Sequence, residues 1–447
     1  MILHMNTISS LGLAGMIVVA AAVVYALTFL AALLAILGRR VDALRVPFVG
    51  RPGGRRDSRF WYRVADFVMA RPWPIVIPVV LLLLALGLPL QRIRLGAGDA
   101  TTLPASRESR RGEDLLQHEF PGAGTNPVVM VLRYREGSPL TARRISALYD
   151  LSRWIQTLPG VKRLDSIVDL APGISREQYV QVAAVPPAFR PPGLDVAFKQ
   201  MAGEHVVIVA VHTHLPAASD EARALVRRIR SEHPPIDAEL MLTGPTAFDL
   251  DFIDVVHAAT PAAIGFVVVA TYVALFLLLR SVLLPLKAIV MNLLSITASY
   301  GALVWIFQEG HFASWLGFTP APIETPIPLI MFCLIYGLSM DYEVLLLART
   351  SEEWLRTGDN ARAVAESLAH TGRLITGAAA IMAGVFFGFG VANSVTMIKA
   401  MGIGMGIAVI VDATIVRALL VPATMRLLGT WNWWAPGGLA PRPRTEG

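Results

Sequence analysis

Charged residues are scarce in this chain, and their scarcity excludes an ordinary soluble domain. Only 16% of the 447 residues are Asp, Glu, Lys or Arg, whereas 54% are hydrophobic. A soluble domain of average composition carries about 25% charged residues. The net charge of +6 does not indicate nucleic-acid binding, because the arginines gather in short segments that flank apolar runs. The composition therefore predicts an integral membrane protein.

Cysteine and nucleotide-binding motifs are also nearly absent. Cys333 is the only cysteine, so an intramolecular disulfide is impossible. The chain has no GxxxxGK[ST] phosphate loop, which argues against ATP hydrolysis, and no other signature of a soluble enzyme. His212 and His214 share one face of a predicted strand, but two alternate histidines without a third ligand do not predict a metal site. We therefore expect no enzymatic activity, no cofactor and no metal.

The chain does contain seven apolar runs that are long enough to cross a bilayer, for which about 20 residues are needed. They cover residues 11–37, 74–91, 259–280, 282–307, 326–348, 373–394 and 400–427. The first run is too long for the core of a cleavable signal peptide, so we expect a spanning helix there. Between the third and fourth runs, Arg280, Pro285 and Lys287 predict a tight turn rather than one very long helix.

The positions of Lys and Arg predict the side of the membrane on which each loop lies, because positively charged loops favour the cytoplasm. The segment 39–72 is rich in arginine: Arg39, Arg40, Arg45, Arg51, Arg55, Arg56, Arg59, Arg63 and Arg71. Alternation from there places the turn at 280–287, the segment 349–373 and the tail after Arg426 on the cytoplasmic side. The loop 308–325, which has neither Lys nor Arg, then lies outside, as does the long segment 92–258.

That outer segment has the size and pattern of a separate α+β domain. Two strand, helix, strand units follow one another at 126–134, 141–158 and 160–168, and at 205–215, 219–232 and 238–244. Ser219 as a cap, with Asp220 and Glu221 in the first turn, marks the start of the second helix. Two successive βαβ units predict the split βαβ order of a ferredoxin-like fold.

The predicted fold class is an α-helical polytopic membrane protein of about seven transmembrane helices with one extracytoplasmic α+β ferredoxin-like domain. We expect six parts: a transmembrane helix at 1–38, a cytoplasmic linker at 39–72, a transmembrane helix at 73–92, the outer domain at 93–257, a five-helix transmembrane bundle at 258–428 and a cytoplasmic tail at 429–447. The amphipathic stretch 360–375 suits either a helix at the membrane interface or an ordinary connecting helix.

Ionisable residues inside the predicted spans are candidates for function, because a charge at the bilayer centre costs at least ~2.5 kcal/mol unless the fold shelters it. At the helical rise of 1.5 Å per residue, Asp341 lies about 12 Å from Arg349. In the last span, Asp412 and Arg417 lie about 21 and about 13 Å from Arg426 by the same rise. Asp412 and Arg417 are poorly placed to pair along one face of an α-helix, so we expect each to find its partner on a neighbouring helix.

We hypothesise that Asp341, Tyr342, Asp412 and Arg417 meet in a polar cluster in which one carboxylate exchanges a proton. Burial raises the pKa of a carboxyl group and a nearby arginine lowers it, so a proton can load and leave near neutral pH. Tyr342 would relay or hold the proton. The alternative is a static polar lock between helices, although buried ion pairs seldom add stability over apolar packing. Glu343 is expected to face away from the cluster, toward a neighbouring helix or the inner interface, without a part in the chemistry.

Small residues four apart let helix backbones approach each other in membranes. Gly384 with Gly388, and Gly402 with Gly406, have this spacing. They predict close helix packing, or they are the ordinary glycines of membrane helices.

Four motifs resemble the MMPL (mycobacterial membrane protein large) branch of the resistance-nodulation-division transporters: RFWYRVADFVMARPW at 59–73, LTGPTAFDLDF at 242–252, GLSMDYEVLLLART at 337–350 and DATIVRALLVPATMRLLG at 412–429. The resemblance extends over almost the whole chain, and the last two motifs are specific. It implies a proton-driven exporter of lipids, glycolipids or hydrophobic drugs in the plasma membrane. It also implies that Asp341 and Tyr342 form the proton relay, that Asp412 and Arg417 form the polar pair of the last helix, and that the outer domain is a porter domain.

Such transporters usually have two similar halves, each with one helix, a porter domain and five helices. Here the residues after 72 correspond to one half, and residues 1–38 resemble the last helix of a preceding half. We therefore expect the C-terminal half of a longer transporter, present as a truncated gene model, as a split-gene product that pairs with a separate first half, or as a homodimer. One alternative is a non-transporting accessory subunit of a partner transporter, and another is a half-size auxiliary of protein export. The substrate is not identified by the sequence.

Overall fold

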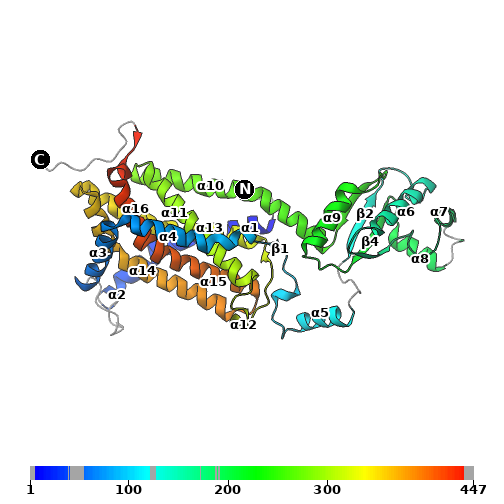
Figure 1. The fold of residues 1–447 in the computed structure, drawn as a ribbon, viewed down its shortest axis with the longest axis horizontal. Helices are drawn as coiled ribbons and strands as arrows, with labels where there is room; N and C mark the ends of the chain where they lie inside the picture. The colour runs from blue at the N-terminus through cyan, green and yellow to red at the C-terminus, as the bar shows by residue number, and fades with distance from the viewer. Residues whose placement is uncertain are drawn as a thin grey trace.

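The computed structural model describes residues 6–38, 40, 55–120, 127–171, 173–186, 189 and 192–436. A helical bundle occupies one end of the molecule and an α+β domain the other (Figure 1). Among the described residues, seven helical segments are long and apolar enough to cross a membrane. They run over Gly12–Leu37, Pro72–Arg92, Pro245–Leu279, Leu283–Gln308, Pro326–Thr357, Asn360–Ala392 and Thr396–Trp433. The prediction of a polytopic membrane protein with about seven spans is confirmed.

The bundle is built from long helices that are joined by short connections. Its helices are α3 (Arg55–Ala70), α4 (Pro72–Gly87), α10 (Pro245–Leu279), α11 (Leu283–Leu303), α13 (Pro326–Thr357), α14 (Asn360–Ala392), α15 (Thr396–Ile410) and α16 (Val421–Leu428). The π-helix η7 (Val411–Leu420) joins α15 to α16, and a second one, η6 (Val304–Gln308), ends α11. Shorter pieces are η3 (Leu88–Arg92), α12 (Ala313–Leu316) and η8 (Gly429–Trp433). Buried side chains such as Tyr336 and Phe307 fill the interior.

The expected tight turn between the third and fourth spans is present. Helix α10 ends at Leu279, and Arg280 follows in the left-handed conformation with φ 50°. Helix α11 begins three residues later, at Leu283. A left-handed residue just after a helix is a common way to end it, so the sequence breaks here rather than forming one long span.

The stretch 360–375 does not form a separate helix at the membrane interface. It is the first half of α14, a single helix of 33 residues without a break. At 1.5 Å per residue such a helix is about 50 Å long, which exceeds the ~30 Å of bilayer hydrocarbon. Asp359 caps its start by accepting from the backbone N–H groups of Ala361 and Arg362. The amphipathic pattern therefore belongs to the end of a spanning helix that extends beyond the hydrocarbon.

The α+β domain has the strand order that its sequence pattern predicts. Its elements are β2 (Val128–Arg133), α6 (Ala142–Gln156), β3 (Val161–Asp165), α7 (Arg176–Ala184), α8 (Pro192–Met201), β4 (Val206–Thr213), α9 (Asp220–Glu232) and β5 (Glu239–Thr243). The four strands form an antiparallel sheet in the order β3-β4-β2-β5. This is the split βαβ arrangement of a ferredoxin-like fold. Ser219 caps α9 by accepting from the N–H of Ala222, as expected.

The boundary between the α+β domain and the bundle lies inside one helix. Helix α10 continues from the domain into the bundle over 35 residues, about 52 Å at the helical rise. Its first turns are fixed to the domain by a buried ion pair, in which Arg223 Nη2 of α9 lies 2.7 Å from Asp249 Oδ2. The structure thus has a continuous helix across residue 257, where a domain end was expected, because α10 serves both parts.

A short pair of strands joins two segments at the end of the bundle helices. The short strands β1 (Leu95–Gly96) and β6 (Ile323–Glu324) pair in parallel, so that the segment after α4 lies beside the segment before α13. The turn η4 (Ala100–Thr102) and the exposed helix α5 (Glu108–Glu119) follow β1. In Figure 1, β1 lies between the bundle and the α+β domain.

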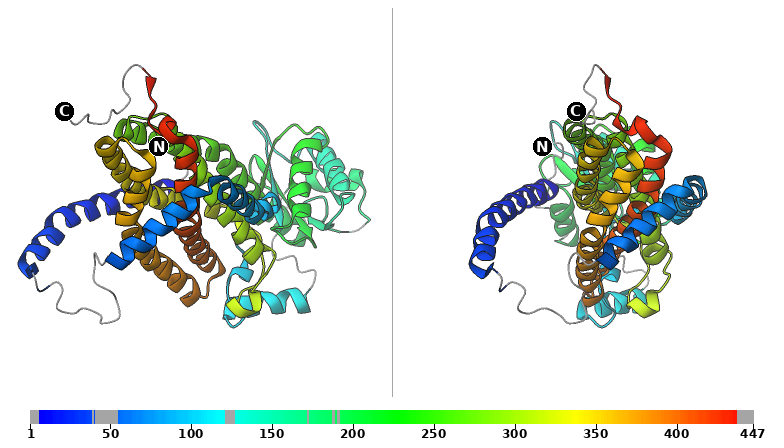
Figure 2. Two further views of the ribbon diagram at one scale, coloured as in Figure 1. Left: turned by 60° about the vertical axis from the view of Figure 1, so that its left-hand side comes forward. Right: turned by 90° about the vertical axis from the view of Figure 1, so that its left-hand side faces the viewer.

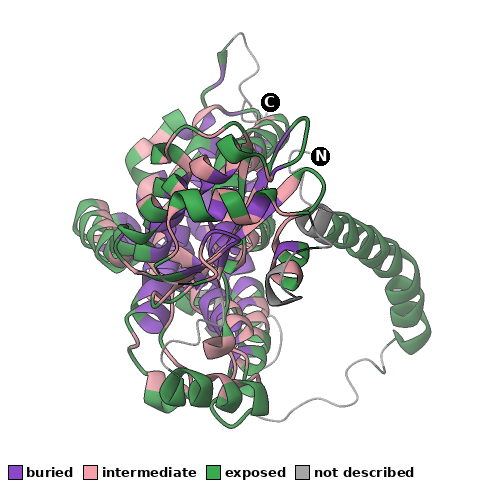
Figure 3. Ribbon diagram, turned by 90° about the vertical axis from the view of Figure 1, so that its right-hand side faces the viewer, coloured by how far each residue is buried: buried purple, intermediate pink, exposed green. Residues whose placement is uncertain are grey.

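The first span stands apart from the bundle. Helices α1 (Asn6–Tyr25) and α2 (Ala31–Leu37), with the π-helix η1 (Ala26–Leu30) between them, form one long rod (Figure 2). None of its described side chains is buried, so the rod is exposed throughout (Figure 3). Of the expected cytoplasmic linker at 39–72, residues 39 and 41–54 lie outside the described residues, and most of the remainder forms helix α3. Of the expected tail at 429–447, residues 437–447 also lie outside them.

Two of the four spaced glycines lie at close helix contacts and two do not. A Cβ on Gly402 of α15 would lie 2.6 Å from the Cα of Gly390 on α14, and one on Gly406 would lie 2.9 Å from the ring of Phe387. A Cβ on Gly384 or Gly388 would meet nothing within 4 Å. Close packing therefore holds for Gly402 and Gly406, whereas Gly384 and Gly388 fit the alternative of ordinary membrane-helix glycines.

Candidate functional site

Asp412 and Arg417 form a buried ion pair with each other inside the bundle. Arg417 Nη2 lies 2.8 Å from Asp412 Oδ2, and Arg417 Nε donates to the same oxygen at 3.0 Å. The expectation that each residue would pair across to another helix is wrong. Residues 411–420 form a π-helix, whose hydrogen bonds join residues five apart, so positions 412 and 417 lie one above the other. The five-residue spacing, which does not place two side chains on one face of an α-helix, therefore allows Asp412 and Arg417 to pair here.

Arg417 also connects this pair to α13. Its guanidinium donates to the backbone carbonyl of Ser339 and to the Ser339 hydroxyl, the latter at 3.3 Å. The Ser339 hydroxyl donates to Asn292 Oδ1 of α11 at 2.7 Å. Taken as whole residues, all four are at most 5% exposed. A continuous polar network therefore runs from Asp412 through Arg417 and Ser339 to Asn292.

Tyr342 joins this network through its ring. The guanidinium of Arg417 lies 5.0 Å from the centre of the Tyr342 ring, within the range of a cation–π contact. The Tyr342 hydroxyl donates to the sulfur of Met382 on α14. A pocket of about 260 Å³ borders the same residues and is lined by Ile335, Ser339, Tyr342, Ala379, Val409 and Asp412 among others. Tyr342, Asp412 and Arg417 thus meet as expected.

Asp341 does not lie inside the bundle. Its side chain is exposed, and among the described residues it makes no hydrogen bond or ion pair. It belongs to an uncovered face of α13 with Cys333, Leu334, Gly337 and Leu345, which follow the helical spacing of three and four residues. The prediction that Asp341 is buried in the interior cluster is therefore wrong for this chain by itself, although Asp341 lies close enough to the cluster for the charge of Arg417 to act on it. The bundle packs against the opposite face of α13, where Met340 and Leu347 lie.

Glu343 is the acidic residue of this stretch that the bundle buries, since it is only 3% exposed. The charge of Lys287 on the neighbouring helix α11 acts on it, although neither Glu343 Oε1 nor Lys287 Nζ has a hydrogen-bond partner within the described residues. The helical projection predicted that Glu343 faces away from the cluster, and this is wrong: Glu343 is buried one turn from Ser339, which accepts from Arg417. Glu343, Lys287, Ser339 and Asn292 were missed as site residues. Their signal was weak, because only the four-residue spacing of Ser339 and Glu343 marks a shared buried face.

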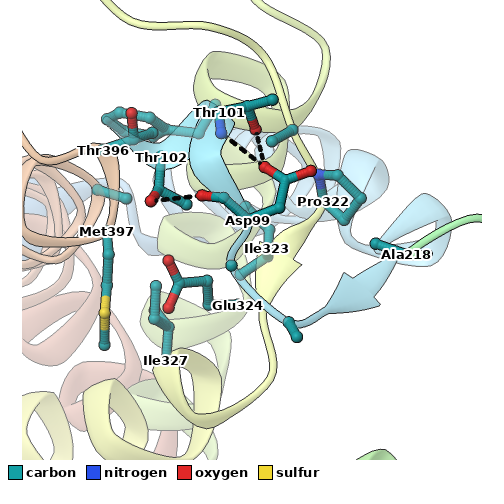
Figure 4. A pocket seen from close by; sticks show the side chains of 15 residues that line it. Asp99, Thr101, Thr102, Ala218, Pro322, Ile323, Glu324, Ile327, Thr396 and Met397 are labelled. Atoms are coloured by element: carbon teal, nitrogen blue, oxygen red, sulfur yellow. Dashed lines mark hydrogen bonds between the residues drawn. The ribbon is translucent and has the colours of Figure 1, made fainter. Parts of the chain in front are cut away.

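A larger pocket, of about 500 Å³, lies where the bundle meets the α+β domain (Figure 4). The side chains of Asp99 and Glu324 border it together with apolar Phe307, Ile327 and Met397. Asp99 is fixed as the cap of η4, where it accepts from the Thr101 N–H at 2.7 Å. Burial, and next the negative charge of Asp99, raise the pKa of Glu324.

No metal centre was expected, and within the described residues no group of three or more His, Cys, Asp or Glu side chains is placed to hold a metal ion. His212 has another partner, because its Nε2 lies 2.8 Å from Asp165 Oδ2 on the neighbouring strand β3. The hydrogen bond to Asp165 accounts for the presence of His212 on the strand, and no metal-ligand role is needed for it.

The fold and the buried cluster define a multi-pass membrane protein whose α+β domain is inserted between two spans and whose last span carries a buried Asp-Arg pair. The chain belongs to the MMPL family: the family model matches residues 1–75 and 101–446. The expectation drawn from the motifs is confirmed.

Curated relatives agree with this assignment. The trehalose monomycolate exporter MmpL3 of Mycobacterium tuberculosis is 31% identical over 438 residues, which are 92% of this chain and 44% of that protein. The heme uptake protein MmpL11 of the same organism is 31% identical over 98% of this chain and 42% of its own length. The putative membrane protein SCO6666 of Streptomyces coelicolor is 34% identical over 96% and 53%, respectively. The chain therefore spans about half the length of the curated relatives that it matches.

Proposed function

We propose that this chain is one half of a proton-driven transporter that exports lipids or other hydrophobic compounds across the plasma membrane. The observation that carries the proposal is the buried Asp412–Arg417 pair, which lies inside a bundle of predominantly apolar helices with Tyr342 beside it. Charged residues within a membrane are costly and often mark proton pathways. One curated relative is named an exporter of a lipid, trehalose monomycolate, and this supports a lipid substrate.

The proton cycle uses the competition between burial and the arginine charge. Asp412 is deprotonated when it pairs with Arg417, and a proton that binds to its carboxylate weakens the ion pair. Release of the pair frees Arg417 to strengthen its contacts with Ser339 and Tyr342 on α13. Binding of a proton thereby changes the contact between η7 and α13. A contact with two alternative arrangements is what a transporter needs in order to switch between its states.

A second unit of the same kind completes the site. Asp341 lies on the uncovered face of α13, and a carboxylate there is costly against lipid. A partner half that packs on this face would shelter Asp341 and bring it next to polar groups of its own. In this arrangement the α+β domain is a porter domain outside the cytoplasm and the arginine-rich segments lie inside.

The test compares the extractable lipids of a deletion strain with those of its parent, followed by complementation. We expect the deletion strain to lose a surface lipid and the wild-type gene to restore it. Asp412→Asn is expected not to restore it, because an amide cannot take up the proton. Asp254→Asn is the matched control, since Asp254 is exposed on α10.

Full restoration by Asp412→Asn would contradict a proton role of the buried pair. Asp341→Asn is examined in the same way, because unchanged proton-coupled transport in that variant would exclude Asp341 from the relay. Unaltered lipids in the deletion strain, together with loss of a partner transporter from the membrane, would instead favour an accessory subunit.

A further inference from the structure

Glu343 and Lys287 are two buried charges that the proposed proton site does not use. Glu343 is 3% exposed, and its Oε1 has no hydrogen-bond partner within the described part of the chain. The Nζ of Lys287 is buried and without a hydrogen-bond partner within the same residues. Buried polar groups are nearly always paired, and those left unpaired in a native fold need a functional or structural reason.

Their position along the helices places them between the Asp412–Arg417 pair and one end of the bundle. Ser339, which accepts from Arg417, and Glu343 are four residues apart on α13, so they lie one turn apart on the same buried face. Lys287 is in the first turn or so of α11, four residues after Leu283, which is about 6 Å along the axis. The arginine distribution assigns this end of α11 to the cytoplasm. Glu343 and Lys287 therefore continue the polar network in the cytoplasmic direction.

The charges that act on Glu343 come from two helices. Lys287 of α11 acts most strongly, and Arg417 and Asp412 of η7 follow. Tyr336, about two turns away on α13 itself, is also affected by the charge of Glu343. Glu343 is thus coupled at the same time to the buried pair above it and to the lysine below it.

We infer that Glu343 is an inner proton station between Asp412 and the cytoplasm, and that Lys287 is its positioning residue. The inference rests on the proposed proton-driven transport. When the O–H bond of the Asp412 carboxyl group breaks, the proton binds to the Glu343 carboxylate. That second O–H bond breaks as the proton leaves toward the cytoplasm. The ammonium group of Lys287 balances the negative charge of Glu343 whenever the carboxylate is unprotonated.

A static interhelical lock is the competing explanation, and a spectroscopic experiment separates the two. Infrared difference spectra of the purified full chain are recorded between acidic and alkaline buffer. We expect a carboxyl C=O band of a water-shielded group that disappears in Glu343→Gln and persists in Glu352→Gln. Glu352 is the matched control on the same helix, with a side chain 67% exposed. If Glu343→Gln leaves every carboxyl band of the difference spectrum unchanged, Glu343 does not exchange a proton and the inference is overturned.

Complementation of the deletion strain adds a second readout. Lys287→Met and Glu343→Gln each leave the other group buried alone, so both single variants are expected to lower the amount of protein in the membrane. The double variant Lys287→Met/Glu343→Gln is expected to regain the wild-type amount but not lipid export. Recovery of both by the double variant would show a lock, and the inference would be wrong.

Failure of the inference differs from failure of the proposed function. If Asp412→Asn abolishes lipid export while the double variant at 287 and 343 exports normally, proton-driven transport stands and only the inner station is excluded. If Asp412→Asn exports as the wild type does, the proposed function itself fails, and the infrared band then decides whether Glu343 nevertheless exchanges a proton.

Discussion

Asp412 and Arg417 form a buried ion pair. The loss of folding stability depends on which of the two side chains is removed, because the remaining one stays buried without its partner. The side chains are 7% and 3% exposed. Breaking such a pair costs about 3–5 kcal/mol in folding free energy when one charge remains buried. Asp412 can relieve the cost by taking up a proton, whereas an arginine stays charged in proteins. We therefore predict that Asp412→Leu lowers the melting temperature of the detergent-solubilised protein more than Arg417→Met does.

The double variant Asp412→Leu/Arg417→Met extends this prediction. Apolar replacements of a buried pair are often neutral or stabilising, so we expect its melting temperature to return to that of the wild type or above. Lipid export in the complemented deletion strain should remain absent, because no group is left to carry the proton. If the double variant instead loses as much as the two single variants together, the two residues are not coupled and the prediction is wrong.

Glu324, outside the membrane-spanning segments, supports a prediction about pH. Because burial and Asp99 raise the pKa of Glu324, the folded protein binds this proton more tightly than the unfolded chain does. The stability that Glu324 contributes is thus fully present below the ordinary carboxyl pKa. It is lost as the pH rises through the pKa that Glu324 has in the folded protein. Glu324→Gln should therefore melt at a higher temperature than the wild type in alkaline buffer, and the difference should vanish in acid. The control Glu204→Gln, at a side chain that is 90% exposed, should show no such pH dependence.

At the scale of single residues, the sequence predicts which residue types matter better than it predicts where they point. Asp412, Arg417 and Tyr342 come together as expected, because a charge in an apolar span must be sheltered. The pairing within one helix was not predictable, since an α-helical projection does not anticipate a π-helix. The exposure of Asp341 and the burial of Glu343 were not predictable either. It depends on which face of α13 the bundle covers, and both faces carry apolar residues.

Helices α14 and α15 approach each other closely enough for a test at the scale of elements. A Cβ added at Gly402 would meet the backbone of Gly390, so Gly402→Ala must push the two helices apart. Overpacking of this kind typically costs about 1–3 kcal/mol. Gly388→Ala is the matched control on α14, where open space is available and alanine favours the helix by up to about 1 kcal/mol. We predict a lower melting temperature for Gly402→Ala and an unchanged or higher one for Gly388→Ala, and the reverse order would contradict the packing.

The elements themselves were largely predictable, and the exceptions have a common cause. The seven spans, the turn at Arg280 and the strand order of the α+β domain follow from hydrophobic length, turn residues and alternation. The ends of the long helices were not predictable. Helices α10 and α14 extend well beyond their apolar runs, because packing and capping continue them after the hydrophobic pattern ends.

At the scale of the whole molecule, the exposed face of α13 is where a partner is expected to pack. The only cysteine, Cys333, lies on this face and can be used to detect a partner there. Cys333 and Asp341 lie on the same exposed face of α13, and the rod formed by α1 and α2 does not cover it, since none of its described side chains is buried. If a second copy packs there about a twofold axis, the same face of both copies meets at the interface.

We predict that mild oxidation of native membranes links two copies through Cys333. Cys333→Ala with Leu277→Cys, which moves the thiol to an exposed position of α10, should remain monomeric. A monomer in both cases would contradict a homodimer through this face and indicate that a different half shelters Asp341.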